Sequence, residues 1–242
     1  MNTQPAPSFS RFVTGFVLLA SMLLANFTSA SAAQTCYVKA GASGIGTSWA
    51  NAFGSLQTAL TNPLCTQIWV AKGTYKPTTG LDRTISFVLM NGVAVYGGFL
   101  GTETLLSQRN PVLNETILSG NIGNLASPSD NSYRVVVGTG TNNTAILDGF
   151  TITAGNSNAA SPFDIGGGML NNPGSPSLAN LKFTGNLAAA GGGLFNSAGS
   201  NPTLVKVDFI NNSVSNAGGG IFNGGNPTLT NVTFTENQAT NS

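Results

Sequence analysis

The sequence predicts an all-β chain folded as a parallel β-helix, in which each coil of the backbone stacks on the coil before it. A phrase of three glycines, two apolar residues and an asparagine begins at Gly166, Gly191 and Gly218, with spacings of 25 and 27 residues. The segments between these phrases alternate apolar and polar residues with a period of two, as strands do. A fixed repeat of this length indicates a unit that buries its apolar face only by stacking on its neighbours.

Identical side chains recur in register and are expected to form columns along the stack. Successive coils pair at about 4.8 Å, so a residue should lie over its equivalent one repeat away. Asparagine tolerates turns and bonds to nearby backbone, which favours a structural role over the alternative of binding sugar or metal. The expected ring stack contains Phe183, Phe209 and Phe234. Two ladders of side-chain amides are expected, one of Asn171, Asn196 and Asn223 and one of Asn186, Asn212 and Asn237.

The paired motifs GGGM/FTGN, GGGL/FINN and GGGI/FTEN, within about residues 147–242, resemble the repeats of chlamydial polymorphic outer membrane proteins and similar bacterial surface proteins. This resemblance implies a right-handed, single-stranded β-helix at the cell surface with an adhesin-like role and no catalytic residues. The segments YV, SWANAF and IWVAKGTY are similar to the opening of many bacterial proteins of the pectate-lyase-like fold. Members of the surface family usually continue to a membrane barrel or sorting segment, whereas this sequence stops in mid-repeat at Ser242.

The composition excludes two classes of partner. Only 7% of the residues are charged, and the formal net charge is +1. Nucleic acids and anionic membranes attract proteins with a concentrated basic surface, which so few balanced charges do not supply.

Residues 1–33 are interpreted as a signal peptide. Arg11 precedes the apolar stretch Phe12–Ala25, and an Ala-Ser-Ala cleavage motif follows. The alternative, an uncleaved membrane anchor, needs about 20 apolar residues, and Asn26 and Thr28 interrupt the run. No transmembrane segment is expected in the mature chain.

Residues 34–76 are expected to form an N-terminal cap and the first coil, because the open end of a solenoid must be covered. The pattern indicates a strand, a glycine-rich loop, a short helix capped by Ser55, and a second strand. In an oxidising compartment Cys36 and Cys65 would pair; the alternative is two buried free thiols. The aromatic residues of this segment are expected to pack in the cap, with a carbohydrate platform as the alternative; they are Tyr37, Trp49, Trp69 and Tyr75.

Residues 77–242 are assigned to the β-helix, with wider coils over 84–153. The best candidates for a binding surface are three loops that leave the coils, Thr102–Leu113, Asn121–Asn131 and the insertion Asn156–Ile165.

The carboxylates are scattered, so the sequence predicts no catalytic site. Laying the coils in register places Lys182 beside Asp208, with Asp148 one coil away on the other side. The simplest interpretation is a Lys182–Asp208 ion pair on a solvated face; the alternative is the remnant of a polysaccharide lyase site. Lattice binding is also disfavoured, because these two charges interrupt the row of hydroxyls that it requires.

The sequence therefore predicts an exported, non-enzymatic surface protein with no cofactor and no bound metal. Its ligand is expected to be a surface ligand such as a glycan or a host or matrix protein, and end-to-end self-association is expected as well. The runner-up is a carbohydrate-active enzyme, a polysaccharide lyase or glycoside hydrolase.

Overall fold

The computed structural model describes residues 1–4 and 34–240. The expected signal peptide therefore lies outside the described residues except for its first four, and Ser242 lies outside them as well. The described residues from 34 onward belong to one compact unit.

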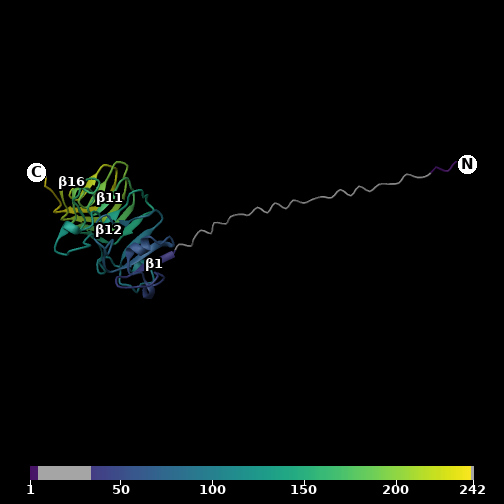
Figure 1. Ribbon diagram of the computed structural model, residues 1–242, viewed down its shortest axis with the longest axis horizontal. Helices are drawn as coiled ribbons and strands as arrows, with labels where there is room; N and C mark the ends of the chain where they lie inside the picture. Colours follow the sequence, from purple (N-terminus) through teal and green to yellow (C-terminus); the bar gives the residue numbers. More distant parts are fainter. Residues whose placement is uncertain (5–33, 241–242) are drawn as a thin grey trace. The chain divides into compact units, whose positions relative to one another are not determined.

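Three parallel sheets build this unit, so the fold is all-β with parallel strands (Figure 1). The ten-stranded sheet contains β1 (Gln34–Val38), β2 (Cys65–Ala71), β3 (Gly73–Tyr75), β5 (Ala94–Phe99), β6 (Thr116–Ser119), β8 (Ile146–Asp148), β9 (Thr151–Thr153), β12 (Ser177–Thr184), β15 (Thr203–Ile210) and β18 (Thr228–Thr235). The five-stranded sheet contains β4 (Phe87–Val88), β7 (Val136–Val137), β11 (Met169–Asn171), β14 (Leu194–Asn196) and β17 (Ile221–Asn223). The four-stranded sheet contains β10 (Asn156–Ser157), β13 (Leu187–Ala190), β16 (Ser213–Ala217) and β19 (Gln238–Ala239).

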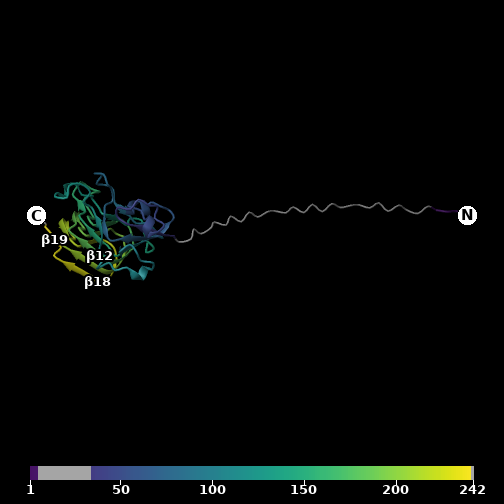
Figure 2. The same cartoon turned by 90° about the horizontal axis from the view of Figure 1, so that it is seen from below.

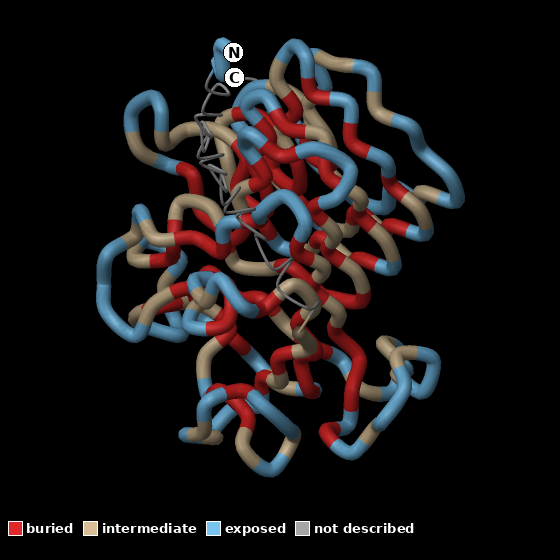
Figure 3. Tube along the Cα trace, turned by 90° about the vertical axis from the view of Figure 1, so that its right-hand side faces the viewer, coloured by how far each residue is buried: buried red, intermediate tan, exposed pale blue. Residues whose placement is uncertain are grey.

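From β11 to β19 the chain visits the three sheets in a fixed order, five-stranded, ten-stranded and then four-stranded. Each of β11 to β16 pairs in parallel with the strand of the same sheet one repeat later. Buried residues recur at the same places in successive turns of the chain (Figure 3). Residues of the same phase therefore lie over one another, as the repeat predicted.

The core of the last repeats is a set of columns formed by β12, β15 and β18. Phe183 pairs with Phe209, and Phe209 with Phe234. Their rings stack at centroid distances of 4.9 and 5.2 Å. The first two side chains are fully buried, whereas Phe234 is 52% exposed. Among the described residues β18 has no strand on its outer side, and it lies at the margin of the unit in Figure 2.

Each of the three eight-residue strands, β12, β15 and β18, contains one residue in the left-handed region. Asn180, Lys206 and Asn231 have φ angles of 49°, 55° and 53°, and each lies between two residues that are paired with the adjacent strands. Gly149 occupies the equivalent place between β8 and β9, with φ 88°. The bend lets two successive side chains face outward without shifting the core residues that follow. The plain alternation of the sequence did not predict this column.

The start of the ten-stranded sheet is covered by the segment between β1 and β2. Phe53 forms a parallel bridge with Val38, and its backbone N–H donates to Tyr37 O. Helix α1 (Leu56–Leu60) follows and buries Leu56, Ala59 and Leu60. Ser55 stands at its N-cap, but its side chain makes no capping hydrogen bond. Three 3-10 turns complete the helical elements of the described residues: η1 (Trp49–Asn51), η2 (Leu106–Gln108) and η3 (Pro128–Asp130).

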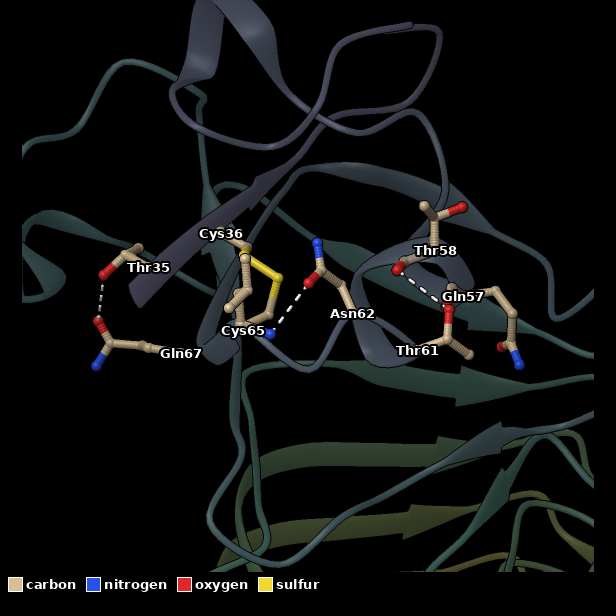
Figure 4. The surroundings of a disulfide bond; sticks show 9 residues. Thr35, Cys36, Gln57, Thr58, Thr61, Asn62, Cys65 and Gln67 are labelled. Carbon is tan, nitrogen blue, oxygen red and sulfur yellow. Dashed lines mark hydrogen bonds between the residues drawn. A yellow bond between two sulfur atoms is a disulfide. The ribbon is translucent and has the colours of Figure 1, made fainter. Parts of the chain in front are cut away.

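A disulfide closes the loop that contains this cover. The sulfurs of Cys36 and Cys65 are 1.95 Å apart, and both side chains are buried (Figure 4). Cys65 N donates to Asn62 O in the turn that follows α1. The bond therefore joins β1, the first strand of the sheet, to the start of β2.

The aromatic residues of the cap pack against one another. Tyr37 meets Trp49 and Trp69 edge to face, and Trp69 stacks on Phe99 with centroids 4.7 Å apart. Tyr75 is buried and donates its hydroxyl hydrogen to Ala71 O over 2.8 Å. Most of this ring surface is therefore used within the cap, as the packing interpretation expects.

One expected feature needs correction. The insertion at 156–165 was expected to be a loop throughout, but it begins with the strand β10, whose residues Asn156 and Ser157 are buried and pair with Leu187 and Ala188.

Within residues 1–4 and 34–240, no helix is long and apolar enough to cross a membrane.

Candidate binding groove

The asparagine column at 186, 212 and 237 is structural. The side-chain Nδ2 of Asn186 donates to Oδ1 of Asn212, and that of Asn212 donates to Oδ1 of Asn237, both over 3.0 Å. Each Oδ1 also accepts from the backbone N–H of the preceding asparagine. The remaining hydrogens of the three amides go to the carbonyls of Ile152, Phe183 and Phe209. These amides join successive repeats and are not available to a ligand.

The second asparagine column is incomplete. Nδ2 of Asn171 donates to Oδ1 of Asn196 over 2.8 Å. Asn223 pairs with Asn196 through the backbone of β17, but its side chain turns to Gly225 O within its own loop. The expected ladder therefore ends after one step, since the exposed loop at Asn223 offers a nearer carbonyl.

A groove of about 370 Å³ lies on the outer face of the ten-stranded sheet. Its floor comes from β9, β12 and β15, and one wall comes from the loop Thr102–Leu113, which was one of the three expected binding surfaces. The lining of this surface, called the groove, includes Pro111, Val112, Glu115, Lys182, Lys206 and Asp208.

The loop is fixed to the sheet by Arg109. Its guanidinium pairs with the Asp148 carboxylate over 2.6 Å, and both side chains are largely buried. The same guanidinium donates to the backbone carbonyl of Gly97 and lies over the ring of Tyr96. Pro111 sits against Gly98, where a β-carbon would come within 2.7 Å of its backbone. The wall is thus held by an ion pair and by close packing on glycine.

Lys182 pairs with Glu115 and not with Asp208, so the expected ion pair is wrong. Nζ of Lys182 lies 2.9 Å from Oε1 of Glu115, which also accepts from the hydroxyl of Thr151. Lys182 and Asp208 are neighbours in register, as expected, but the lysine side chain extends across β9 toward the end of the loop. The hydrogen bond from Lys182 and then that from Thr151 hold the pKa of Glu115 below its usual range. Glu115 is therefore an anion at neutral pH.

Asp208 and Lys206 lie on β15 and have more freedom. Oδ1 of Asp208 accepts from the hydroxyl of Thr233 over 2.5 Å. Lys206 projects from the left-handed position of its strand and is exposed. Only two ion pairs occur among the described residues, and neither involves Lys206 or Asp208. Both groups can therefore face a ligand.

The hydrogen bonds of Glu115 disfavour a role for this residue as a proton donor. A glycosidase of the usual kind needs one carboxyl group that is protonated at working pH, and hydrogen bonds to the charged form oppose this at Glu115. The described residues contain no cluster of three or more metal-ligating His, Cys, Asp or Glu side chains. Paired carboxylates and ammonium groups can instead accept and donate hydrogen bonds from fixed positions.

The other two expected loops are held by arginines outside the groove. Arg83 donates to Asn131 O and Asn156 O, and its guanidinium lies 4.1 Å from the centroid of the Tyr133 ring. Arg134 donates to Ile165 O. Arg83 therefore links the loop at 121–131 to the insertion at 156–165.

Sequence reasoning missed the groove because its parts are distant in the chain. Glu115 and Lys182 are separated by 67 residues, and Glu115 lies outside the repeats that set the register. The fixed position of the loop depends on Arg109 and Asp148, which no periodic pattern links. Comparison of the chain with models of protein families, with curated proteins and with solved structures finds no match in any of the three.

Proposed function

We propose that the chain is an exported, right-handed, single-stranded parallel β-helix that binds a surface ligand without catalysing a reaction. Its role would be adhesin-like or in contact with the cell envelope, as in the chlamydial surface proteins that its repeats resemble. The observation that carries the β-helix is the cycle of β11–β19 through three sheets with identical residues paired one repeat apart. Parallel pairing of successive coils is the defining arrangement of such solenoids.

The disulfide supports the proposal of export. Bonds between cysteines persist in oxidising compartments and are rare in reducing ones. Cys36 and Cys65 are the only cysteines of the chain, and they are bonded. The apolar stretch in the sequence of residues 1–33 also supports export.

The groove supports the proposal of binding. Its wall and floor are joined by the Arg109–Asp148 pair, so little order has to be gained when a ligand enters. Three of its charged groups, Glu115, Lys182 and Asp208, already have hydrogen-bond partners on neighbouring segments.

The test is a binding screen with a catalytic assay alongside. The full chain would be expressed with its leader in a bacterial host, fractionated, and applied to glycans, matrix proteins and envelope preparations. We expect recovery outside the cytoplasm and binding that saturates. Retention in the cytoplasm together with no binding to any of these surfaces would contradict the proposal.

The runner-up, a polysaccharide lyase or hydrolase, has one observation in its favour. Glu115 and Asp208 line the same groove with two lysines between and beside them. Cleavage of pectin or a related polyanion, abolished by Asp208→Ala, would establish it in place of the binding role. We expect no cleavage with or without Ca²⁺.

A further inference from the structure

We propose that the groove binds a neutral oligosaccharide through charged side chains whose charges cancel. This inference rests on the binding role proposed above and adds the chemical class of the ligand.

The charges that line the groove balance. Glu115 and Asp208 contribute two negative charges, and Lys182 and Lys206 contribute two positive charges. A polyanion would meet two carboxylates and a polycation two ammonium groups, and like charges brought together are unfavourable. A neutral ligand avoids both costs.

The carboxylate oxygens and the ammonium group that remain available in the groove can bond to hydroxyl groups of a ligand. Within the described residues Oε1 of Glu115 and Oδ1 of Asp208 already accept hydrogen bonds, which leaves their second oxygens available. Lys206 has no ion-pair partner there. A sugar hydroxyl donates one hydrogen bond and accepts others, so one ligand can satisfy the carboxylates and the ammonium group together. Bonds to ionised partners are the stronger kind.

The wall that the loop Thr102–Leu113 forms is apolar. Pro111 lines it together with Val112, whose side chain is 87% exposed. A sugar ring presents carbon-bound hydrogens on its faces, and these can cover such a wall while the hydroxyls reach the charged floor. The one aromatic ring in the lining, Phe150, is only 2% exposed. We therefore expect hydrogen bonds rather than ring stacking to carry the affinity.

The size of the groove agrees with a short oligosaccharide. Its volume of about 370 Å³ falls within the roughly 300–1,000 Å³ that small-molecule sites occupy. An extended peptide is the other ligand with both polar and apolar groups, and it is an outcome of the test. The cancelled charges and the dense set of acceptors and donors favour the sugar.

The experiment compares hexasaccharides by calorimetry with the purified chain. The neutral probes are hexamers of glucose, mannose, galactose and N-acetylglucosamine; oligogalacturonate is the polyanion and deacetylated chitosan hexamer is the polycation. We expect at least one neutral hexamer to bind more tightly than both charged probes. Its affinity should not change as NaCl rises from about 0.05 to 0.5 M, since screening acts on charged ligands.

Two variants test whether the charge balance of the groove determines its preference for neutral over charged oligosaccharides. Lys206→Asn is suitable because asparagine already occupies the equivalent left-handed positions at 180 and 231, and Asp208→Asn keeps the shape of the side chain. Each should weaken binding of the neutral hexamer by about tenfold or more, the expected effect of losing a hydrogen bond to a charged group. Asp208→Asn should gain affinity for oligogalacturonate, and Lys206→Asn should gain affinity for chitosan. Lys76→Asn, which removes an exposed lysine outside the groove, should change none of these.

Three results would overturn the inference: tighter binding of either charged hexamer by the unaltered chain, binding of a matrix protein or peptide with no binding of any saccharide, or neutral binding that neither groove variant weakens. The second result leaves the proposed surface role standing, so the two proposals fail separately. Thermal unfolding of each variant would show that it is folded.

Discussion

The side-chain amide of Asn186 donates to that of Asn212, one repeat further along the chain, while both side chains are fully buried. This contact joins two coils within the core, where water cannot replace it. The amide of Asn212 serves both neighbours, since it accepts from Asn186 and donates to Phe183 O and Asn237. The ladder therefore contributes to stability through its middle member most of all.

Replacing Asn212 with alanine should destabilise the protein by about 3 kcal/mol, because several buried polar groups lose their partners at once. The matched control is Asn237→Ala, where solvent at the last coil can replace the lost bonds and the cost should be about 1 kcal/mol. Urea denaturation of both variants measures the difference. Equal losses of unfolding free energy would mean that burial does not determine how much each asparagine of the ladder contributes to stability.

The ring column allows a similar comparison. Phe209→Ala removes a fully buried ring between two others and should cost about 3–5 kcal/mol. Phe234→Ala removes a ring that is 52% exposed and should cost no more than about 1.5 kcal/mol. If the two variants unfold at the same denaturant concentration, the column does not form as described.

Reduction of the disulfide should loosen the N-terminal cap. The bond closes a loop with a sequence separation of 29 residues, which corresponds to about 3–4 kcal/mol on the chain-entropy model. The Cys36→Ser, Cys65→Ser double variant should melt at a lower temperature than the unaltered chain. Reductant should lower the melting temperature of the unaltered chain and leave the variant unchanged; a response by both would indicate another cause.

Tyr75 should make stability depend on alkaline pH. Burial raises the pKa of its hydroxyl from 10.0 to about 12, against the hydrogen bond from Ala40 N, which lowers it. Because the pKa is higher in the folded state, the contribution of the Tyr75 hydroxyl to folding stability is present below pH 10 and is lost as pH rises through about 12. Tyr75→Phe should be less stable by about 1 kcal/mol at neutral pH, and the gap should close at alkaline pH. A gap that does not vary with pH would contradict this assignment.

Glu115 should titrate below its usual range, and Lys182 should be the main reason. In Lys182→Met the pKa of Glu115, followed by NMR, should rise toward 4.5. A lowered pKa stabilises the fold above the unfolded value, and this contribution is lost as pH falls through the folded value. Because both side chains are more than a third exposed, the effect on stability should be no more than about 0.5 kcal/mol. An unchanged pKa in the variant would show that the pair does not persist in solution.

The repeats could be read from the sequence because their signal is local and is written three times. The pairing of Phe183 with Phe209 and of Lys182 with Asp208 follows from spacing alone. The bend at Asn180, Lys206 and Asn231 was not predicted, because period-two alternation has no place for two outward residues in succession. The shared column of asparagine and lysine was its only sign.

The groove could not be predicted in the same way. Its wall depends on Arg109 reaching Asp148 across 39 residues of chain, and no pattern specifies such a contact. The register of the repeats correctly placed Lys182 beside Asp208. It did not indicate that the lysine pairs with Glu115 instead, because a long flexible side chain can reach several neighbours. Charge pairing at an irregular loop is decided by the packing of the loop, which lies outside the repeat.

The left-handed column has a consequence for how such a surface can diversify. At positions 180, 206 and 231 the same backbone conformation holds asparagine or lysine, and all three side chains are exposed. An exchange between these two residue types alters what the outer face presents while the packing beneath stays intact. The chemistry of this face can therefore change one repeat at a time with little loss of stability.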